Sequence, residues 1–423
     1  MAMTGKTGGR EALRERAKSV RGHRAFGEAG RQWRRLPPRV RTVIPFVALL
    51  AIAALYPLYQ ASLPTNVPFI LNFPTVGSGV IIIVFVMMAV GLNIVVGYAG
   101  LLDLGYVAFY AVGAYTAGWL ASGHFQQVKI HLGGAGVSPE ARGIHINMWI
   151  VLVVAGILTM IAGILIGIPT LRLRGDYLAI VTLGFGEIIP IFVRNSDNLA
   201  GFNLTAGTFG INPIDSPGFG ASLNESVGLP IAFQTSFDRD KLFFWSALAL
   251  LLITLFCSIR LRDSRLGRAW IAIREDETAA AAMGVPLMRT KTWAYALGAF
   301  FGGIAGAYYA SFKSGAFPAD FYFNISVFLL CMVVLGGMGS VWGVVIAGSI
   351  LAWLNIEGLA NIGSWLKQET PLDFEVAKYQ FGIYGIIIVL MMLFRPTGLI
   401  PESRRKQEME EGVHDESLYG ARH

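Results

Sequence analysis

The sequence predicts an all-α polytopic membrane protein with about ten transmembrane or broken helices. Three observations carry this prediction: a mean hydropathy of +0.56, a charged fraction of only 14%, and apolar residues gathered in long blocks. A soluble globular chain carries roughly 25% charged residues, whereas about 20 consecutive apolar residues cross the hydrocarbon core of a bilayer as a helix. The composition therefore excludes a soluble multidomain protein of this length.

Ten apolar segments are candidate spans. They cover residues 43–63, 78–97, 101–121, 148–168, 177–193, 242–259, 292–310, 324–336, 341–358 and 379–394. The third, fifth and eighth segments are short or interrupted by glycine, and for these we expect broken or re-entrant helices. Such helices survive at membrane depth only where protein or water covers their backbone.

The distribution of positive charge predicts that both termini lie in the cytoplasm. An even number of spans places the termini on one side, and that side collects 26 of the 34 Lys and Arg residues. Cytoplasmic loops are enriched in these residues. We therefore expect a basic, disordered cytoplasmic tail over 1–41, a transmembrane domain over 42–400 with a long external loop at 195–241 and a cytoplasmic loop at 260–291, and a charged cytoplasmic tail over 401–423.

The cytoplasmic loop contains a charged stretch that becomes rich in alanine, RAWIAIREDETAAAAMGVP (268–286). Strong helix formers fill it, and Gly284 provides a stop. We expect one continuous helix up to that point, on which Ile273, Glu277, Ala280 and Gly284 share a face. The small alanines would let the helix enter a groove on a partner closely. A solvated loop helix with chance alanines is the alternative that the pattern leaves open.

The chain offers no complete phosphate-binding loop. TGKTGG at 4–9 matches only the end of the motif G-x-x-x-x-G-K-[ST] and lacks its first glycine and its strand–helix context. We expect no ATPase site, no cofactor and no enzymatic activity in this chain. Three histidines in the external loop 122–147, at His124, His131 and His145, are widely spaced and lack acidic or thiol partners, so a metal site is not expected there.

Five stretches of the chain, taken together and in this order, resemble the branched-chain amino acid permease family of ABC importers, in its LivM branch. They are GLNIVVGYAGLLDLGYVAFYAVGAYTAG (91–118), LRLRGDYLAIVTLGFGEI (171–188), LGRAWIAIREDETAAAAMGV (266–285), VVLGGMGSVWG (333–343) and RPTGLIP (395–401). The resemblance covers about residues 78–401. It implies an ABC importer permease fold in the bacterial cytoplasmic (inner) membrane.

The resemblance also implies partners and a coupling helix. The partners are a second permease of the LivH type, two ATPase subunits of the LivG and LivF type that use the ATP, and a periplasmic or extracellular amino-acid-binding protein. The cytoplasmic helix would fit a cleft on the ATPase. Its residues in this sequence are Arg268, Arg274, Glu275, Asp276, Glu277, Ala279, Ala280 and Gly284. One departure is the external TAGTFGI (205–211), where the family usually has TGGxNGI.

Four residues are candidates for the translocation path because an ionised side chain at the bilayer centre costs about 2.5–3.5 kcal/mol and usually faces a cavity or a partner. Asp103, Tyr106 and Tyr110 would form an i, i+3, i+7 stripe on one helix, and Glu187 follows two glycines that would loosen its helix. Two alternatives stay open: Asp103 caps a helix or lies near the membrane surface, and Glu187 pairs with Arg194.

Two glycine patterns predict close packing or a turn. Gly298, Gly302 and Gly306 recur every four residues, which suits a close helix crossing. LGGMGS (335–340) predicts either a tight turn or a broken-helix gate.

The function expected from the resemblance is import of leucine, isoleucine or valine, with alternating access driven by the separate ATPases. Two other functions remain open. Related permeases carry urea or short amides by the same mechanism. An ion-coupled secondary transporter would instead use Asp103 and Glu187 as proton or ion sites and would work without partners.

Overall fold

The computed structural model describes residues 50–63, 73–173, 175–199, 201–235, 238–369, 376–395 and 397–400. The tails predicted at 1–41 and 401–423 lie outside the described residues. The chain divides into two compact units, Met1–Ala61 and Ser62–His423. In the first unit, residues 50–59 are helical, and the Tyr59 hydroxyl donates to the Ile52 carbonyl at 3.2 Å. A short 3-10 helix η1 (Gln60–Ser62) follows.

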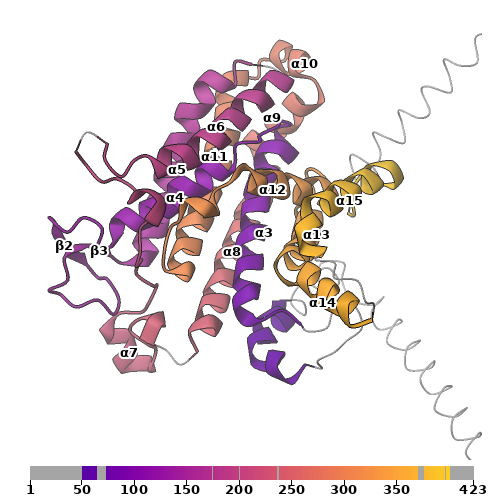
Figure 1. The fold of residues 1–423 in the computed structure, drawn as a ribbon. Coiled ribbons are helices and arrows are strands. Elements are labelled where there is room, and N and C mark those ends of the chain that lie inside the picture. Colours follow the sequence, from indigo (N-terminus) through magenta and orange to yellow (C-terminus); the bar gives the residue numbers. More distant parts are fainter. Residues whose placement is uncertain are drawn as a thin grey trace, which may run out of the picture. The chain divides into compact units, whose positions relative to one another are not determined.

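The second unit is built from helices (Figure 1). They are α3 (Val76–Asn93), the π-helical turn η2 (Ile94–Tyr98), α4 (Val107–Leu120), α5 (Met148–Thr170), α6 (Asp176–Arg194), α7 (Ala221–Val227), α8 (Arg239–Asp263), α9 (Arg265–Glu275), α10 (Glu277–Ala282), α11 (Leu287–Lys313), α12 (Phe323–Gly336), α13 (Val341–Trp353), the π-helical turn η6 (Leu354–Gly358), α14 (Leu359–Glu369) and α15 (Gln380–Phe394). Within the described ranges, seven helices are long and apolar enough to cross a membrane. The predicted all-α polytopic fold class is confirmed.

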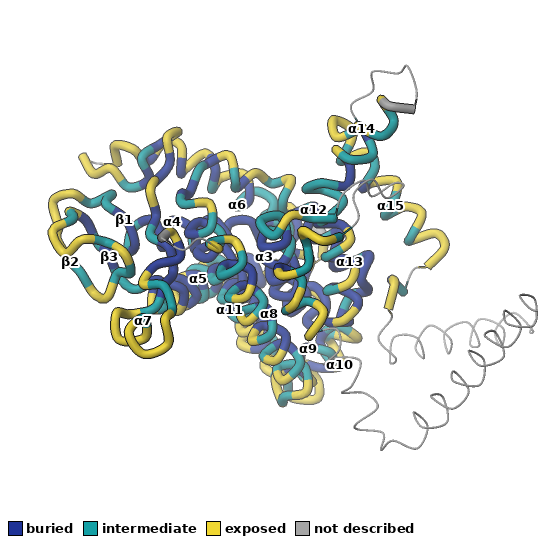
Figure 2. Tube along the Cα trace, turned by 90° about the horizontal axis from the view of Figure 1, so that it is seen from below, coloured by how far each residue is buried: buried dark blue, intermediate teal, exposed yellow. Residues whose placement is uncertain are grey.

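Helices α3, α4 and α11 form the interior of the second unit. α3 is apolar on every side and mostly buried, as expected for a helix surrounded by protein. α11 packs against α5, α4 and α3. Figure 2 shows the contrast between the buried α3 and α4 and the more exposed α14 and α15.

The third predicted segment is a broken helix. Residues 99–105 are not helical, and α4 begins only at Val107. Other helices satisfy the backbone of this interruption: the Val107 N–H donates to the Ser326 hydroxyl at 2.9 Å, and the Leu104 N–H donates to the Thr182 hydroxyl at 3.1 Å. This is the protein cover that irregular backbone requires at membrane depth.

The other two uncertain segments are not broken. α6 continues through both of its glycines from Asp176 to Arg194, so a break in the fifth segment was wrongly expected. α12 is short but unbroken. It ends at a turn in which Gly337 and Gly339 have φ of 103° and 91°, and the Gly339 N–H donates to the Asn93 side-chain carbonyl at 2.9 Å. The stretch 335–340 thus includes a tight turn.

The two loops that were predicted to be external contain structure that the sequence did not predict. β1 (Ala121–Ser122), β2 (Lys129–Leu132) and β3 (Gly143–Ile146) form a sheet in the order β1-β3-β2, antiparallel between β1 and β3 and parallel between β2 and β3. Strands of two to four residues are too short to give a recognisable alternation. The remaining short helical turns are η3 (Gly207–Phe209), η4 (Phe233–Thr235), η5 (Pro318–Asp320) and η7 (Val376–Tyr379). In Figure 1, α7 and α10 lie at opposite ends of this unit.

Candidate functional site

The predicted coupling helix is two helices, α9 and α10, separated at Asp276. This residue is extended, with φ −153° and ψ 111°. Its carboxylate accepts hydrogen bonds from the Thr278 N–H at 2.8 Å, the Thr278 hydroxyl at 2.6 Å and the Ala279 N–H at 3.0 Å. The bond from the Thr278 hydroxyl, followed by the two backbone bonds, lowers the pKa of the Asp276 carboxyl below its ordinary value.

The single continuous helix was therefore a wrong prediction, and the cause is local. Aspartate is among the best helix N-caps because its side chain bonds the first free N–H groups of a new helix. The shared face of four residues does not exist across this break. Ile273 of α9 and Ala280 of α10 are nevertheless both buried, whereas Glu277 is half-buried and Gly284 exposed.

The predicted stop at the end of this segment is confirmed. Gly284 has φ 85°, a left-handed conformation that glycine adopts without steric cost. Its N–H donates to the Ala281 carbonyl, and the Val285 N–H donates to the Ala280 carbonyl, both at 3.0 Å. This pair of bonds closes the last turn of α10 as helix C-caps commonly do.

Two side chains of α9 reach the membrane helices. Arg274 donates from Nη1 to the Gly97 carbonyl in η2 at 2.6 Å. Trp270, which is fully buried, donates from Nε1 to the Thr290 carbonyl at the start of α11 at 2.7 Å. Helix α9 is thus attached at once to the end of the α3–η2 helix and to the beginning of α11.

An ion pair attaches α10 to the same place. The Glu277 Oε1 and the Lys291 Nζ of α11 lie 2.8 Å apart, and the two side chains are 28% and 5% exposed. We call the side chains of Trp270, Arg274, Glu277 and Lys291, with these three contacts, the coupling clamp. A displacement of α9 and α10 would be passed through it to α3 and α11.

Trp270, Lys291 and Gly97 were missed by the sequence analysis. The signal for Trp270 was its large apolar ring in an otherwise charged loop, because such a ring usually packs against another part of the protein. Lys291 carries no local signal, since a lysine at the cytoplasmic end of a span is expected from charge distribution alone.

The opposite side of α9 and α10 is uncovered within the described structure. Met283 is 85% exposed, and Ala279, Ala281 and Ala282 are exposed beside it. Arg268 and Glu275 are exposed as well, and Arg268 Nη1 donates to the Asp263 carbonyl at 3.0 Å. The predicted coupling residues therefore divide into two sets. Arg274, Glu277 and Ala280 face the membrane helices, while Arg268, Glu275, Asp276, Ala279 and Gly284 face outward.

Asp103 lies in the interruption before α4, so the predicted stripe with Tyr106 and Tyr110 on one helix is wrong. The residue is buried, and its Oδ1 accepts the Gly105 N–H at 2.9 Å. Among the described atoms its Oδ2 has no hydrogen-bond partner. A cavity of about 10 Å³, lined in part by Asp103 and Tyr295, has room for about one water molecule.

Tyr106 and Tyr110 fill the crossing of α4 and α11. The Tyr106 hydroxyl donates to the Gly298 carbonyl at 2.8 Å, and a Cβ atom at Gly302 would meet the Tyr106 ring at 3.1 Å. A Cβ atom at Gly306 would overlap the Tyr110 carbonyl oxygen. Gly302 and Gly306 thus lie where α4 approaches α11, whereas a Cβ atom at Gly298 would overlap the Val95 side chain of η2. In this conformation both tyrosines are packing residues, and their place on a translocation path stays a prediction.

Glu187 is exposed on α6. The expected ion pair with Arg194 is not among those of the described residues; the Arg194 Nη2 instead donates to the Tyr322 hydroxyl at 3.2 Å. Because α6 is unbroken, the carboxylate lies on a regular helix face rather than in a loosened segment. Asp103 and Glu187 are thus in different surroundings, one buried and one exposed.

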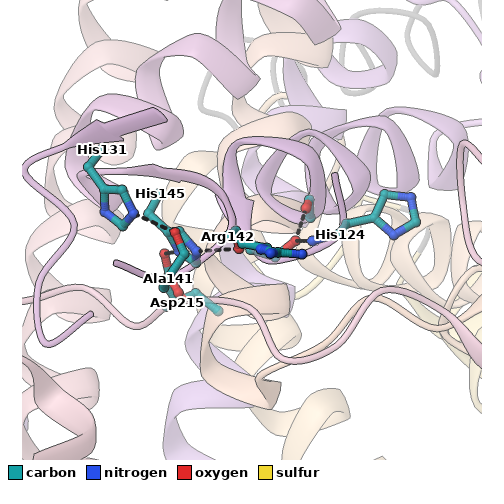
Figure 3. A network of polar contacts seen from close by, with 9 residues as sticks. His124, His131, Ala141, Arg142, His145 and Asp215 are labelled. Carbon is teal, nitrogen blue, oxygen red and sulfur yellow. Dashed lines mark hydrogen bonds and ion pairs between the residues drawn. The ribbon is translucent and has the colours of Figure 1, made fainter. Parts of the chain in front are cut away.

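A polar network joins the two loops that were predicted to be external, 122–147 and 195–241 (Figure 3). His145 Nδ1 and Asp215 Oδ2 lie 2.7 Å apart, and the His131 ring stacks on His145 with centroids 5.0 Å apart. His131 Nε2 contacts the Ala141 carbonyl at 2.9 Å. Burial raises the pKa of the Asp215 carboxyl, and the bond to His145 opposes this rise. His124 contacts the Asn203 carbonyl at 3.0 Å. These contacts give the loop histidines a structural role.

Comparison with known proteins identifies the family. Residues 74–393 match the model of the family described as branched-chain amino acid transport system / permease component. The chain is 36% identical over 384 residues to the high-affinity branched-chain amino acid transport system permease protein LivM of Escherichia coli (strain K12). The aligned region covers 88% of this chain and 78% of that protein.

More distant relatives extend the comparison. The probable branched-chain amino acid transport permease protein LivM of Methanocaldococcus jannaschii is 25% identical over 334 residues, covering 75% of this chain and 90% of that protein. The permease protein LivH of Escherichia coli (strain K12) is 28% identical over 176 residues, covering 41% of this chain and 51% of that protein. No solved structure matches the chain significantly. The chain belongs to the permease component family of branched-chain amino acid transport systems, as a LivM-type member.

Proposed function

We propose that this chain is one permease subunit of an ATP-driven, binding-protein-dependent importer of leucine, isoleucine and valine in the bacterial inner membrane. Its termini face the cytoplasm. The names of the LivM relatives support the substrate class, and 26 of 34 Lys and Arg residues on the side of the termini support the orientation.

The observation that carries the mechanism is the coupling clamp. The exposed alanine side of α10 is narrow enough to enter a cleft of a partner ATPase, while the clamp attaches the same segment to α3 and α11. ATP binding at the partner would displace α9 and α10. α3 and α11 would follow, because the clamp ties both to that segment, and access to the path would alternate.

The family and the LivM relatives support a set of partners for this subunit. The chain carries no complete phosphate-binding loop, so ATP is bound and hydrolysed by two separate subunits and the chain itself is no enzyme. A second permease of the LivH type completes the membrane part, consistent with the similarity of this chain to LivH. The external end, with α7 and the sheet β1-β3-β2, would receive the amino-acid-binding protein.

Co-purification and reconstitution test this proposal. The tagged chain is purified from its native membrane in a gentle detergent, its companions are identified by mass spectrometry, and the complex is reconstituted into vesicles. We expect two ATPases and a second permease, and ATP-dependent uptake of leucine but not of urea. Ala281→Trp on the exposed side of α10 should abolish uptake, whereas Ala281→Ser should preserve it. Uptake by the chain alone under an ion gradient would refute the proposal and support an ion-coupled transporter, and uptake of urea would change the substrate class.

A further inference from the structure

A cavity of about 200 Å³ lies between the coupling segment and the membrane helices. Four parts of the chain line it: residues 99–102 after η2, the segment leading into α6, helices α9 and α10, and the start of α11. Its volume is about twenty times that of the one-water cavity beside Asp103. This is the size class of a small metabolite rather than of a nucleotide or a peptide.

One part of the cavity is charged with both signs. Arg274, Lys291 and Glu277 all line it. Lys291 is buried, and one of the three donors of its ammonium group meets Glu277. The guanidinium of Arg274 has five N–H donors, of which Nη1 meets the Gly97 carbonyl. These two cations and one carboxylate match a ligand that carries one carboxylate and one ammonium group.

Aliphatic side chains also line the cavity, beside Ala99, Gly100 and Gly175. Leu101, Leu102, Leu173, Leu178 and Ile273 line the cavity. Leu102 and Leu173 are 39% and 38% exposed, so the cavity reaches the surface of the described structure beside them. Burying apolar surface of a ligand against these side chains would contribute about 25 cal/mol per Å². A charged part next to an aliphatic wall is the pattern expected for an amino acid with an aliphatic side chain.

We propose that this cavity binds a zwitterionic α-amino acid with an aliphatic side chain from the cytoplasm. The ligand carboxylate faces Arg274 and Lys291, its ammonium faces Glu277, and its side chain lies along Leu102 and Leu173. The bound molecule contacts α9, α10 and the start of α11 at once. It therefore holds the coupling segment in place and slows import when the product accumulates inside the cell.

The regulatory consequence rests on the proposed function, but binding itself does not, so the two are tested separately. Binding of radiolabelled L-leucine is measured on the full chain in lipid nanodiscs. Two competitors each lack one charge: 4-methylpentanoate has no ammonium group, and 3-methylbutylamine has no carboxylate. We expect both to compete at least tenfold more weakly than L-isoleucine. Equal competition by either analogue would overturn the zwitterion assignment without any variant.

Variants locate the bound leucine. Leu102→Trp and Leu173→Trp fill the cavity and should raise the Kd at least tenfold. Leu165→Trp is the matched control, since Leu165 is 66% exposed on α5 and does not line the cavity. Wild-type affinity in both cavity variants would place the leucine elsewhere and overturn the inference.

Transport by the reconstituted complex then separates the two proposals. With L-leucine preloaded inside the vesicles, the wild type should be slowed and Leu102→Trp should not. No binding to a wild-type chain whose complex imports leucine would overturn this inference and leave the proposed function intact. The complete complex could instead bind L-leucine in this cavity without importing leucine. That result would refute the proposed function and leave the inferred binding site intact.

Discussion

Removing the Glu277 carboxylate tests whether its ion pair with Lys291 transmits motion from α10 to α11. In Glu277→Gln the shape of the side chain is retained, but the ammonium of Lys291 loses its counter-charge. The Lys291 side chain is only 5% exposed and that of Glu277 is 28% exposed. Exposed ion pairs contribute about 0–1 kcal/mol, and breaking a buried pair by removing one partner costs about 3–5 kcal/mol. With one buried and one partly exposed member, we expect the free energy of unfolding to fall by about 1–3 kcal/mol.

The double variant Glu277→Gln with Lys291→Met separates stability from coupling. Since no charge is then left buried without a partner, much of the lost stability should return. Uptake per ATP hydrolysed should stay low in both variants, because the contact between α10 and α11 is absent in both. The assay is thermal unfolding of the reconstituted complex together with leucine uptake and ATP hydrolysis in the same vesicles.

A control and a refuting result complete this test. Arg262 and Asp263 form an exposed pair 3.2 Å apart, with the aspartate side chain 63% exposed. Asp263→Asn should therefore change stability by less than about 0.5 kcal/mol and leave uptake unaltered. If the double variant imports leucine with wild-type coupling, the ion pair does not transmit the motion and the reasoning fails.

Three further predictions concern single positions. Asp276→Ala should loosen the start of α10 and reduce ATPase coupling, whereas Asp276→Asn should retain the coupling because asparagine still caps a helix. Equal loss of coupling in both variants would show that the charge rather than the cap is needed. Gly306→Ala should prevent assembly in the membrane because its Cβ overlaps a backbone carbonyl, while Gly184→Ala, with nothing within 4 Å, should assemble normally, as measured by size-exclusion chromatography. Ala206 has φ 58°, a left-handed conformation that costs a residue with a side chain about 1–2 kcal/mol. Ala206→Gly should therefore raise the thermal unfolding temperature, and a lower temperature would contradict the strain.

The sites could be predicted only in part. The coupling segment was found because helix formers, charges and alanines are adjacent in the chain. Its break at Asp276 was also readable, since an aspartate followed by Glu277 and Thr278 is a usual helix start, but the run of helix formers concealed it. The stripe of Asp103, Tyr106 and Tyr110 failed because periodicity cannot tell an extended entry from the first turns of a helix.

The sequence by itself determined the membrane class, the places of most spans and the stop at Gly284, because hydropathy and turn preference are properties of short stretches of chain. Only the tertiary structure decided how the coupling segment is attached. Arg274 meets a carbonyl 177 residues away in the chain, and the interruption before α4 is satisfied by hydroxyls of α6 and α12. Contacts between residues so far apart depend on how the helices pack, and no local pattern in the chain encodes that packing.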